Sequence, residues 1–268
     1  MNTKLLTIIM VATTMLISCG DGKPKSTTTS KKETSSSGKK GSSESFGKYI
    51  GGQVTNGGSI TGVVKASQKA DEIRAIKGDK LKAERDLCGA SVPAEKFVIK
   101  NGNLKWAVAM LQGISKGKAI DKQKTITYDN VLCRFVPHVA VATKGSMLSI
   151  KNSDPVLHNS HLYLLKGGKK RTLVNLALPR KNQVISKTRF TRKTGLIEVL
   201  CDAHDFMQGY IWVLPHPYGA VTNDDGSFKL TDVPAGSYKL KVWHEALGEK
   251  VVSVDVKAGQ DSKVTVNF

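Results

Sequence analysis

Alternating apolar and polar residues are the clearest pattern in this chain, and they are most regular near its C-terminus. Tyr238, Leu240 and Val242 would face one side of a strand while the lysines between them face the other. Residues 252–256 and 264–268 repeat this period of two. The C-terminal part therefore predicts a series of half-buried strands.

Short strand-like segments separated by Gly or Pro also fill the preceding part of the chain. They span residues 59–66, 97–100, 106–111, 139–150, 162–165, 173–176, 184–190, 196–200 and 210–214. Only residues 69–86 are rich in helix-forming side chains, and their periodicity is too poor to assign a helix. Many short strands with few helices predict an all-β fold, either a sandwich or a barrel.

The N-terminal residues predict export and lipid anchoring. Lys4 precedes an apolar run, residues 5–17, which fits the core of a signal peptide but is too short to span a bilayer as a helix. The run ends in L-I-S-C at positions 16–19, which resembles the lipobox of bacterial lipoproteins and implies cleavage before Cys19 and lipidation of its sulfur. The predicted segments are a signal peptide over 1–18 and a disordered Ser- and Lys-rich tether over 19–48.

Location and charge limit the partners of an exported protein. Gly20 stands where inner-membrane lipoproteins of enteric bacteria carry Asp, which favours the periplasmic face of the outer membrane. The formal charge is +19, from 41 Lys and Arg against 22 Asp and Glu. After export this excess favours anionic lipid headgroups or an acidic partner protein, and not nucleic acid. Because the lysines are scattered, a solvated surface with no single partner is an equal alternative.

Four cysteines constrain the disulfide pairing. If Cys19 carries lipid, three are left, and an oxidising compartment favours pairing of two of them. Because Cys201 has a His and a Met close by in the sequence, we predict a disulfide between Cys88 and Cys133 and a free Cys201 that acts as a ligand. The alternative for the first two cysteines is a pair of buried free thiols.

Three metal-binding side chains follow one another closely on a predicted loop between two strands. Cys201, His204 and Met207 stand at intervals of three. A copper ion that cycles between two oxidation states suits two imidazoles, a thiolate and a weak axial thioether. A second imidazole is available at His158, in the stretch K-N-S-D-P-V-L-H-N. Zinc prefers Cys and His without a thioether, and no C-x-x-C-H motif for a c-type haem occurs.

The two motifs, N-S-D-x-x-x-H-N and C-x2-H-x2-M, resemble those of the cupredoxins, the type 1 blue copper proteins. The downstream spacing is closest to the amicyanin type, and the resemblance covers residues 139–214. It implies a Greek-key sandwich in which His158, Cys201 and His204 are the equatorial copper ligands and Met207 is the axial one.

The same resemblance bears on the neighbouring polar residues. Asn159 matches the position that braces the ligand loops. His161 would lie on the opposite face of a strand from His158, so we expect it to be structural. Three more histidines are expected to pack in loops or at a strand end and not to bind metal: His138, His216 and His244.

A second resemblance covers the C-terminal part, which is similar to bacterial envelope proteins that join a cupredoxin-type site to a carboxypeptidase regulatory-like, or transthyretin-like, β-sandwich. The matching stretches are 216–218, 224–226, 233–238 and 243–245. The predicted boundaries are a cupredoxin-like domain over 49–215 and the second sandwich over 216–268. Residues 59–64 also resemble the opening strand of the second sandwich, which would make the cupredoxin part an insertion.

From these features we expect a lipid-anchored carrier of single electrons in the bacterial cell envelope, with one type 1 copper. It would not be an enzyme, because no bond is made or broken. The resemblance implies electron passage through the solvent-facing edge of His204 to a redox partner protein, such as a cytochrome, a copper protein or a quinoprotein enzyme. Two alternatives stay open: a copper protein for delivery or sensing, and a metal-free envelope binding module.

Overall fold

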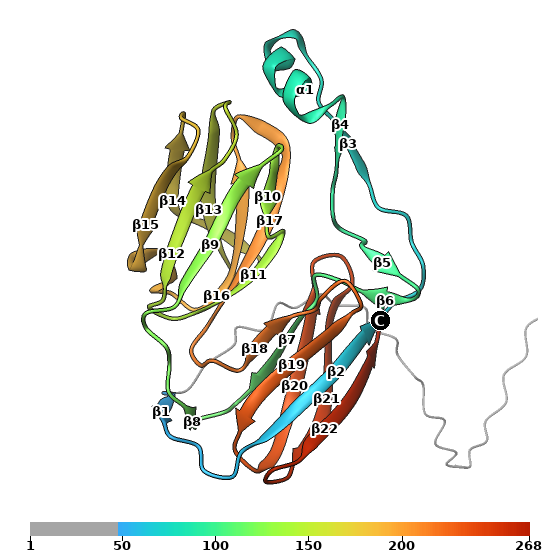
Figure 1. Cartoon of the computed structure of the whole chain (residues 1–268), viewed down its shortest axis with the longest axis vertical. Helices are drawn as coiled ribbons and strands as arrows, with labels where there is room; N and C mark the ends of the chain where they lie inside the picture. Colours follow the sequence, from blue (N-terminus) through green and yellow to red (C-terminus); the bar gives the residue numbers. More distant parts are fainter. Residues whose placement is uncertain (1–47) are drawn as a thin grey trace, which may run out of the picture. The chain divides into compact units, whose positions relative to one another are not determined.

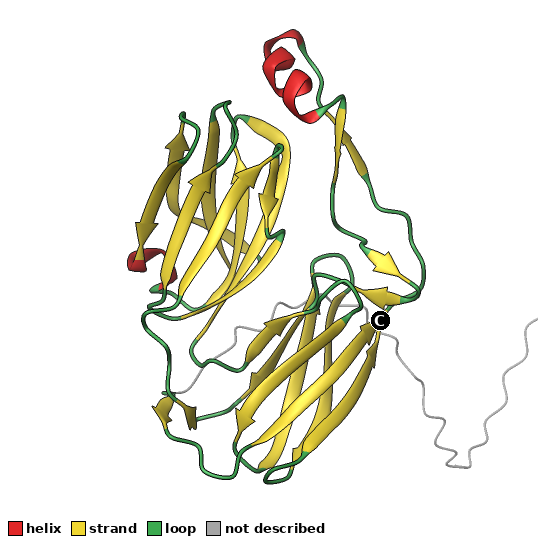
Figure 2. Ribbon diagram, in the orientation of Figure 1, coloured by secondary structure: helices red, strands yellow, loops and turns green. Residues whose placement is uncertain are grey.

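The computed structural model describes residues 48–268 (Figure 1). The expected signal peptide, the lipidation site Cys19 and the tether as far as residue 47 lie outside the described residues. Figure 2 shows that strands, in yellow, make up nearly all of the regular structure. No helix within residues 48–268 has the length and apolar character needed to cross a membrane. The prediction of an all-β chain is confirmed.

The first of two sandwiches, called here the inserted sandwich, spans residues 125–214. Its first sheet contains, in spatial order, β10 (Arg134–Val136), β9 (Thr125–Val131), β12 (Met147–Asn152) and β15 (Gln183–Lys187). Its second sheet contains β11 (Val139–Thr143), β17 (His204–Leu214), β16 (Gly195–Cys201), β13 (His158–Lys166) and β14 (Lys169–Leu178). A short 3-10 turn, η2 (Thr188–Thr191), follows β15.

Alternating side chains from both sheets fill the core of the inserted sandwich. Ile197, Val199 and Cys201 occupy every second position of β16 and are buried in one cluster with Leu148 and Ile150 of β12. Cys201 therefore belongs to the core face of its strand and lies at the strand's end.

β17 is buried on both faces, which explains the unbroken apolar run Y-I-W-V-L. Ile211 and Val213 join the core of the inserted sandwich. The alternate residues Tyr210, Trp212 and Leu214 belong to a second cluster. That cluster also includes Val108, Met110, Val139 and Trp243.

The second sandwich, called here the flanking sandwich, is formed by strands from two parts of the chain. One sheet contains β18 (Gly219–Val221), β7 (Val108–Gln112), β20 (Gly236–His244) and β21 (Gly248–Val256). The other contains β19 (Ser227–Val233), β2 (Gly58–Lys65), β6 (Asn103–Leu104) and β5 (Ile99–Lys100), with β22 (Asp261–Asn267) also paired to β2.

The structure divides the chain differently from the boundary expected between residues 215 and 216. β2 pairs with β19 and with β22, and β7 pairs with β18 and β20. Residues 58–65 and 99–112 therefore belong with the C-terminal strands, and residues 125–214 are inserted between β7 and β18. A linear boundary cannot express this arrangement, because the pairing joins segments that are far apart in the sequence.

A second excursion, called here the arm, spans residues 73–93 between β2 and β5. It contains β3 (Ile73–Ala75), η1 (Asp79–Leu81), α1 (Lys82–Cys88) and β4 (Ser91–Pro93), and β3 pairs with β4. Figure 1 shows α1 at the tip of this arm. The stretch rich in helix formers thus becomes a short strand, a turn and one short helix. A separate short pair joins β1 (Ile50–Gly52) to β8 (Lys116–Lys118).

Candidate metal centre

Two of the predicted ligands lie on one tight hairpin. β16 ends at Cys201, β17 begins at His204, and these two residues are partners across the hairpin. Only Asp202 and Ala203 connect the strands. The loop expected between the strands at 196–200 and 210–214 is therefore a two-residue turn followed by a long strand.

His158 opens β13 and brings a second imidazole to this hairpin. Its Nδ1 atom lies 3.0 Å from Nδ1 of His204, and Sγ of Cys201 lies 3.5 Å from the same His204 atom. One donor atom from each of the three residues lies within 4.8 Å of the others, and all three side chains are buried. Donors that share one ion at about 2.0–2.3 Å are separated by distances of this order.

Carboxylates hold the far nitrogen of each ring. Nε2 of His158 lies 2.9 Å from Oδ2 of Asp154, and Nε2 of His204 lies 3.2 Å from Oε1 of Glu84. A carboxylate oxygen can only accept, so each Nε2 carries the proton and donates it. In a neutral ring with this tautomer Nδ1 keeps its lone pair, so two neutral rings would direct both lone pairs to a point beside a sulfur atom. A cation among these three donors would stabilise the arrangement.

The charge state of Asp154 suits this role. Burial raises the pKa of Asp154, but hydrogen bonds from His158 and from the backbone amides of Cys133 and Leu132 outweigh it, so the pKa lies below its usual value. The group is therefore a carboxylate at neutral pH. The pKa of His204 is lowered, first by burial and then by the neighbouring His158, which favours the neutral ring that a metal ion requires.

Asn159 braces the thiol side of the site. Its backbone N–H donates to Sγ of Cys201 at 3.4 Å, and its Oδ1 accepts from the Ala203 amide at 3.2 Å. Its Nδ2 donates to Oδ1 of Asn175 at 2.6 Å, which fixes the side chain. Burial raises the pKa of the Cys201 thiol, and the backbone amides of Asn159, Ala203 and His204 oppose this. A bound cation would favour the thiolate further.

Met207 lies in β17 and is 2% exposed, in the same core cluster as Cys201 and Phe206. The ring of Phe206 stacks on that of His204 with a centroid separation of 5.3 Å, which limits movement of the imidazole. The axial role of Met207 stays a prediction.

The structure contains a disulfide between Cys88 and Cys133, with an S–S distance of 2.00 Å. Cys201 is the free cysteine among the described residues, and it is buried. A second group of potential ligand atoms combines the two bonded cysteines with Asp154. Disulfide sulfurs are not thiolates, so the group around His158 is the better metal site.

Sequence reasoning missed both carboxylates of the site. Asp154 stands in the upstream motif, four residues before His158, and this close spacing was the available signal. Glu84 lies on α1, far from either ligand segment in the sequence. Only the fold brings Glu84 to His204, so no local pattern could have found it.

The other histidines of residues 48–268 lie outside the metal-binding group. His161 hydrogen-bonds Asp202 at 2.9 Å and stacks on Tyr163, and its place in β13 puts it on the opposite face from His158. The others have these partners: His138 contacts Glu245, His216 accepts from the Tyr218 amide, and His244 accepts from the Ala246 amide.

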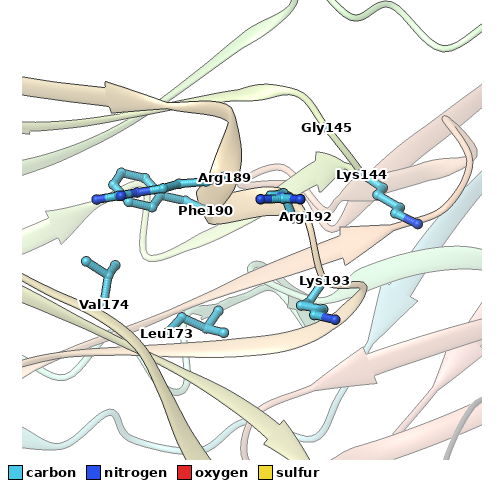
Figure 3. Close-up of a pocket in the computed structure, with 8 residues that line it drawn as sticks. All are labelled: Lys144, Gly145, Leu173, Val174, Arg189, Phe190, Arg192 and Lys193. Carbon is cyan, nitrogen blue, oxygen red and sulfur yellow. The ribbon is translucent and has the colours of Figure 1, made fainter.

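An open pocket lies elsewhere on the inserted sandwich (Figure 3). Leu173, Val174 and Phe190 supply its apolar side chains. Cationic side chains also line it: Lys144, Arg189, Arg192 and Lys193. None of the predicted ligands lines this pocket, so it has no part in the metal chemistry.

Comparison with known families matches residues 211–268 to the carboxypeptidase regulatory-like domain. The matched segment runs from the second half of β17 to the C-terminus and leaves out β2 and β5 to β7, which complete the flanking sandwich in the structure. The comparison with curated proteins found no match.

Solved structures similar to part of this chain include copper proteins. A reduced amicyanin variant has 21% identity and a TM-score of 0.28, over 35% of this chain and 85% of that chain. A purple cupredoxin from Nitrosopumilus maritimus has 19% identity and a TM-score of 0.27, over 32% and 97%. A Cu-containing nitrite reductase from Thermus scotoductus SA-01 has 19% identity and a TM-score of 0.28, over 36% of this chain and only 25% of that chain.

The expected all-β fold class is confirmed by the strands and sheets of the structure, and residues 211–268 match the carboxypeptidase regulatory-like domain. At these TM-scores the similar structures say nothing about chemistry. The function proposed for this chain rests on its own side chains.

Proposed function

We propose that this chain binds one copper ion through His158, Cys201 and His204 and carries single electrons. The supporting observation is the convergence of two imidazole Nδ1 atoms and one thiol within 4.8 Å, in a buried site where a carboxylate holds each Nε2. Two imidazoles and a thiolate form the equatorial donor set of blue copper sites. Met207 would complete the set as a weak axial ligand.

Copper, when bound, supplies a one-electron couple that these ligands accept in both oxidation states. The residues of the chain hold the geometry. The hairpin and Asn159 fix the thiolate, while Asp154 and Glu84 fix the two rings. Because both nitrogens of each imidazole are engaged, the rings would turn little on electron transfer. Burial of His158, Cys201 and His204 keeps bulk water away from the centre.

The proposal extends to the parts of the chain that precede residue 48. Lipidation of Cys19 would anchor the protein in the cell envelope, with the periplasmic face of the outer membrane as the favoured location. The partner would be a redox protein, such as a cytochrome, a copper protein or a quinoprotein enzyme. We propose no enzymatic activity, because electron transfer makes and breaks no bond. The support for these parts is the export signal in the sequence.

The expected electron path through the edge of His204 meets an obstacle in the structure. The ring is only 2% exposed, and Glu84 covers its Nε2 atom. The arm therefore lies where the resemblance implied an open edge.

Copper titration of the full chain in detergent tests the proposal. We expect one copper per chain and an intense visible absorption from the thiolate–copper bond in the oxidised form, which disappears on reduction. Cys201→Ser should remove this absorption, whereas Asp225→Asn, on an exposed turn of the flanking sandwich, should retain it. Tight binding of zinc with no redox-active copper, or no metal binding at all, would contradict the proposal.

A further inference from the structure

The arm is fixed against the metal-binding end of the inserted sandwich by several independent contacts. Cys88, the last residue of α1, is bonded to Cys133 in the turn between β9 and β10. Arg74 of β3 donates to the Phe206 carbonyl at 3.1 Å and to Oε1 of Gln208 at 3.0 Å. Ile76 and Val92 of the arm are buried in the same core cluster as Cys201 and Met207. The arm is thus part of the wall around the site.

Glu84 is the buried residue of α1, and it is 9% exposed. Its Oε1 lies 3.2 Å from Nε2 of His204. Its Oε2 is buried without a hydrogen-bond partner among the described residues. A buried carboxylate with one oxygen unpartnered costs free energy, so its place beside a ligand calls for a role other than stability.

The disulfide joins two residues that lie close to the two carboxylates at the imidazole rings. Cys88 follows Glu84 by one helical turn, so the two side chains share a face of α1. The Cys133 amide donates to Oδ2 of Asp154 at 2.9 Å, and the same oxygen lies 2.9 Å from Nε2 of His158. One covalent bond therefore fixes the arm at a point next to both supports of the metal ligands.

We propose that the arm is a cap on the metal centre, latched by the Cys88–Cys133 disulfide, in which Glu84 positions the His204 ring. Exchange of the ion and access of solvent to Cys201 then require the arm to lift. This proposal rests on the proposed function only for the identity of the ion. Closure over Cys201 is a property of the metal-free chain and can be measured without copper.

Alkylation of Cys201 by iodoacetamide in the metal-free full chain tests the cap. With the disulfide intact, labelling should be slow, because the thiol is 3% exposed. The double variant Cys88→Ala with Cys133→Ala should label on the order of tenfold faster or more, since local opening exposes the site without global unfolding. Peptide mapping identifies the labelled residue, and circular dichroism checks that each variant is folded.

Two further variants keep the result decisive if the double variant does not fold. Glu84→Ala keeps the disulfide but removes the contact with His204, and it should also label faster than the parent. Asp86→Asn changes an exposed residue of the same helix, in an ion pair with Lys82, and should label at the parent rate. Equal labelling rates in the parent, in Glu84→Ala and in any folded disulfide variant would overturn the cap.

The positioning role of Glu84 has its own readout. In Glu84→Gln the side chain can donate as well as accept, so nitrogen NMR of the metal-free chain should show a smaller share of His204 with its proton on Nε2. In the copper-loaded chain, the reduction potential should rise, because a negative charge beside a ligand has been lost. Asp86→Asn removes the same charge from the same helix and should shift the potential much less. Equal shifts in the two variants would overturn the positioning role.

The two tests separate this proposal from the proposed function. Slow labelling of Cys201 that becomes fast when the latch is cut, together with failure to bind copper, would support the cap and refute the copper carrier. Copper binding with fast labelling of Cys201 in the parent would support the copper carrier and refute the cap.

Discussion

The inserted and flanking sandwiches both bury histidines, but they use them differently. In the inserted sandwich, His158 and His204 each have a carboxylate at Nε2, and their Nδ1 atoms meet 3.0 Å apart. In the flanking sandwich, His216 and His244 accept a backbone N–H at Nδ1, each at 3.3 Å. Burial lowers the pKa of each of the latter two to about 4.

This difference shows that burial of an imidazole does not by itself make a metal site. The flanking sandwich uses neutral rings as packing groups whose Nδ1 lone pairs are already engaged by the backbone. In the inserted sandwich, carboxylates direct the protons to the outer nitrogens, and the inner lone pairs converge on a thiol. The direction of the lone pairs, more than the type of residue, defines the candidate centre.

The largest expected effect is that of removing the thiolate. Cys201→Ser should weaken copper binding by more than about 100-fold, because even residues that only support the ligands contribute 10–100-fold. His216→Asn, in the flanking sandwich, should leave copper binding unchanged. Both are measured by copper titration against a competing chelator. Comparable losses in the two variants would erase the distinction between the sandwiches.

Acid should reveal the neutral histidines of the flanking sandwich. His244 has a folded pKa of about 4, below its ordinary value of 6.5, mainly because of burial and then of His138. As the pH falls, His244 therefore takes up a proton at a higher pH in the unfolded chain than in the folded chain. The stability that the neutral ring contributes is complete above pH 6.5 and is lost as the pH falls towards 4, by up to roughly 3 kcal/mol.

Denaturant unfolding followed at several pH values checks this expectation. His244→Phe keeps an aromatic ring beside Phe97 and Phe268 and removes the titrating group, so it should flatten the loss of unfolding free energy between pH 6.5 and pH 4. An identical slope in the variant and the parent would show that His244 does not carry the effect.

The next comparison is between the carboxylate of Asp154, beside His158, and an exposed carboxylate of the flanking sandwich. Asp154→Asn keeps the size of the side chain but no longer forces the ring proton onto Nε2, so copper affinity should fall by about 10–100-fold. Asp225→Asn makes the same change on an exposed turn of the flanking sandwich, where the carboxylate accepts from the Ser227 amide. Its copper affinity should match the parent. Chelator competition on folded protein, checked by circular dichroism, distinguishes lost affinity from lost structure.

The strands and the pairing of Cys201 with His204 were within reach of the sequence because both depend on short spacings. Alternation with a period of two predicted the strands, and the interval between Cys201 and His204 fits two residues that face each other across a hairpin. Asp154, close to His158, was visible in the motif but was not assigned a role. These features are local, so a linear pattern can carry them.

The insertion and the arm depend on contacts between distant segments. The resemblance of residues 59–64 to an opening strand indicated the second sandwich, but the alternation in residues 58–65 does not identify β22 as the strand that pairs with β2. The stretch 69–86 has poor periodicity because it forms a thin arm with few buried positions. Glu84 reaches His204 only through that arm. Sequence patterns describe which face of an element is buried, but they do not say which distant element covers it.

The smallest expected effect concerns two buried side chains that hydrogen-bond nearby backbone groups, Asn159 in the inserted sandwich and Thr222 in the flanking one. The Thr222 hydroxyl accepts from the Ala107 amide at 3.0 Å and donates to the Leu104 carbonyl at 2.8 Å. Thr222→Val leaves a buried amide unpaired and should cost about 1–2 kcal/mol of unfolding free energy, with no change in copper affinity.

Asn159→Ala should show the opposite profile. Its backbone N–H still reaches Sγ of Cys201, so only the side-chain contacts to Ala203 and Asn175 are lost. Copper affinity should fall by less than about tenfold, because the ligands stay and only their support weakens. Titration and denaturant unfolding on both variants give a crossed comparison. If Thr222→Val lowers copper affinity as much as Asn159→Ala, then the brace at Asn159 serves the general stability of the chain and not the ligand hairpin.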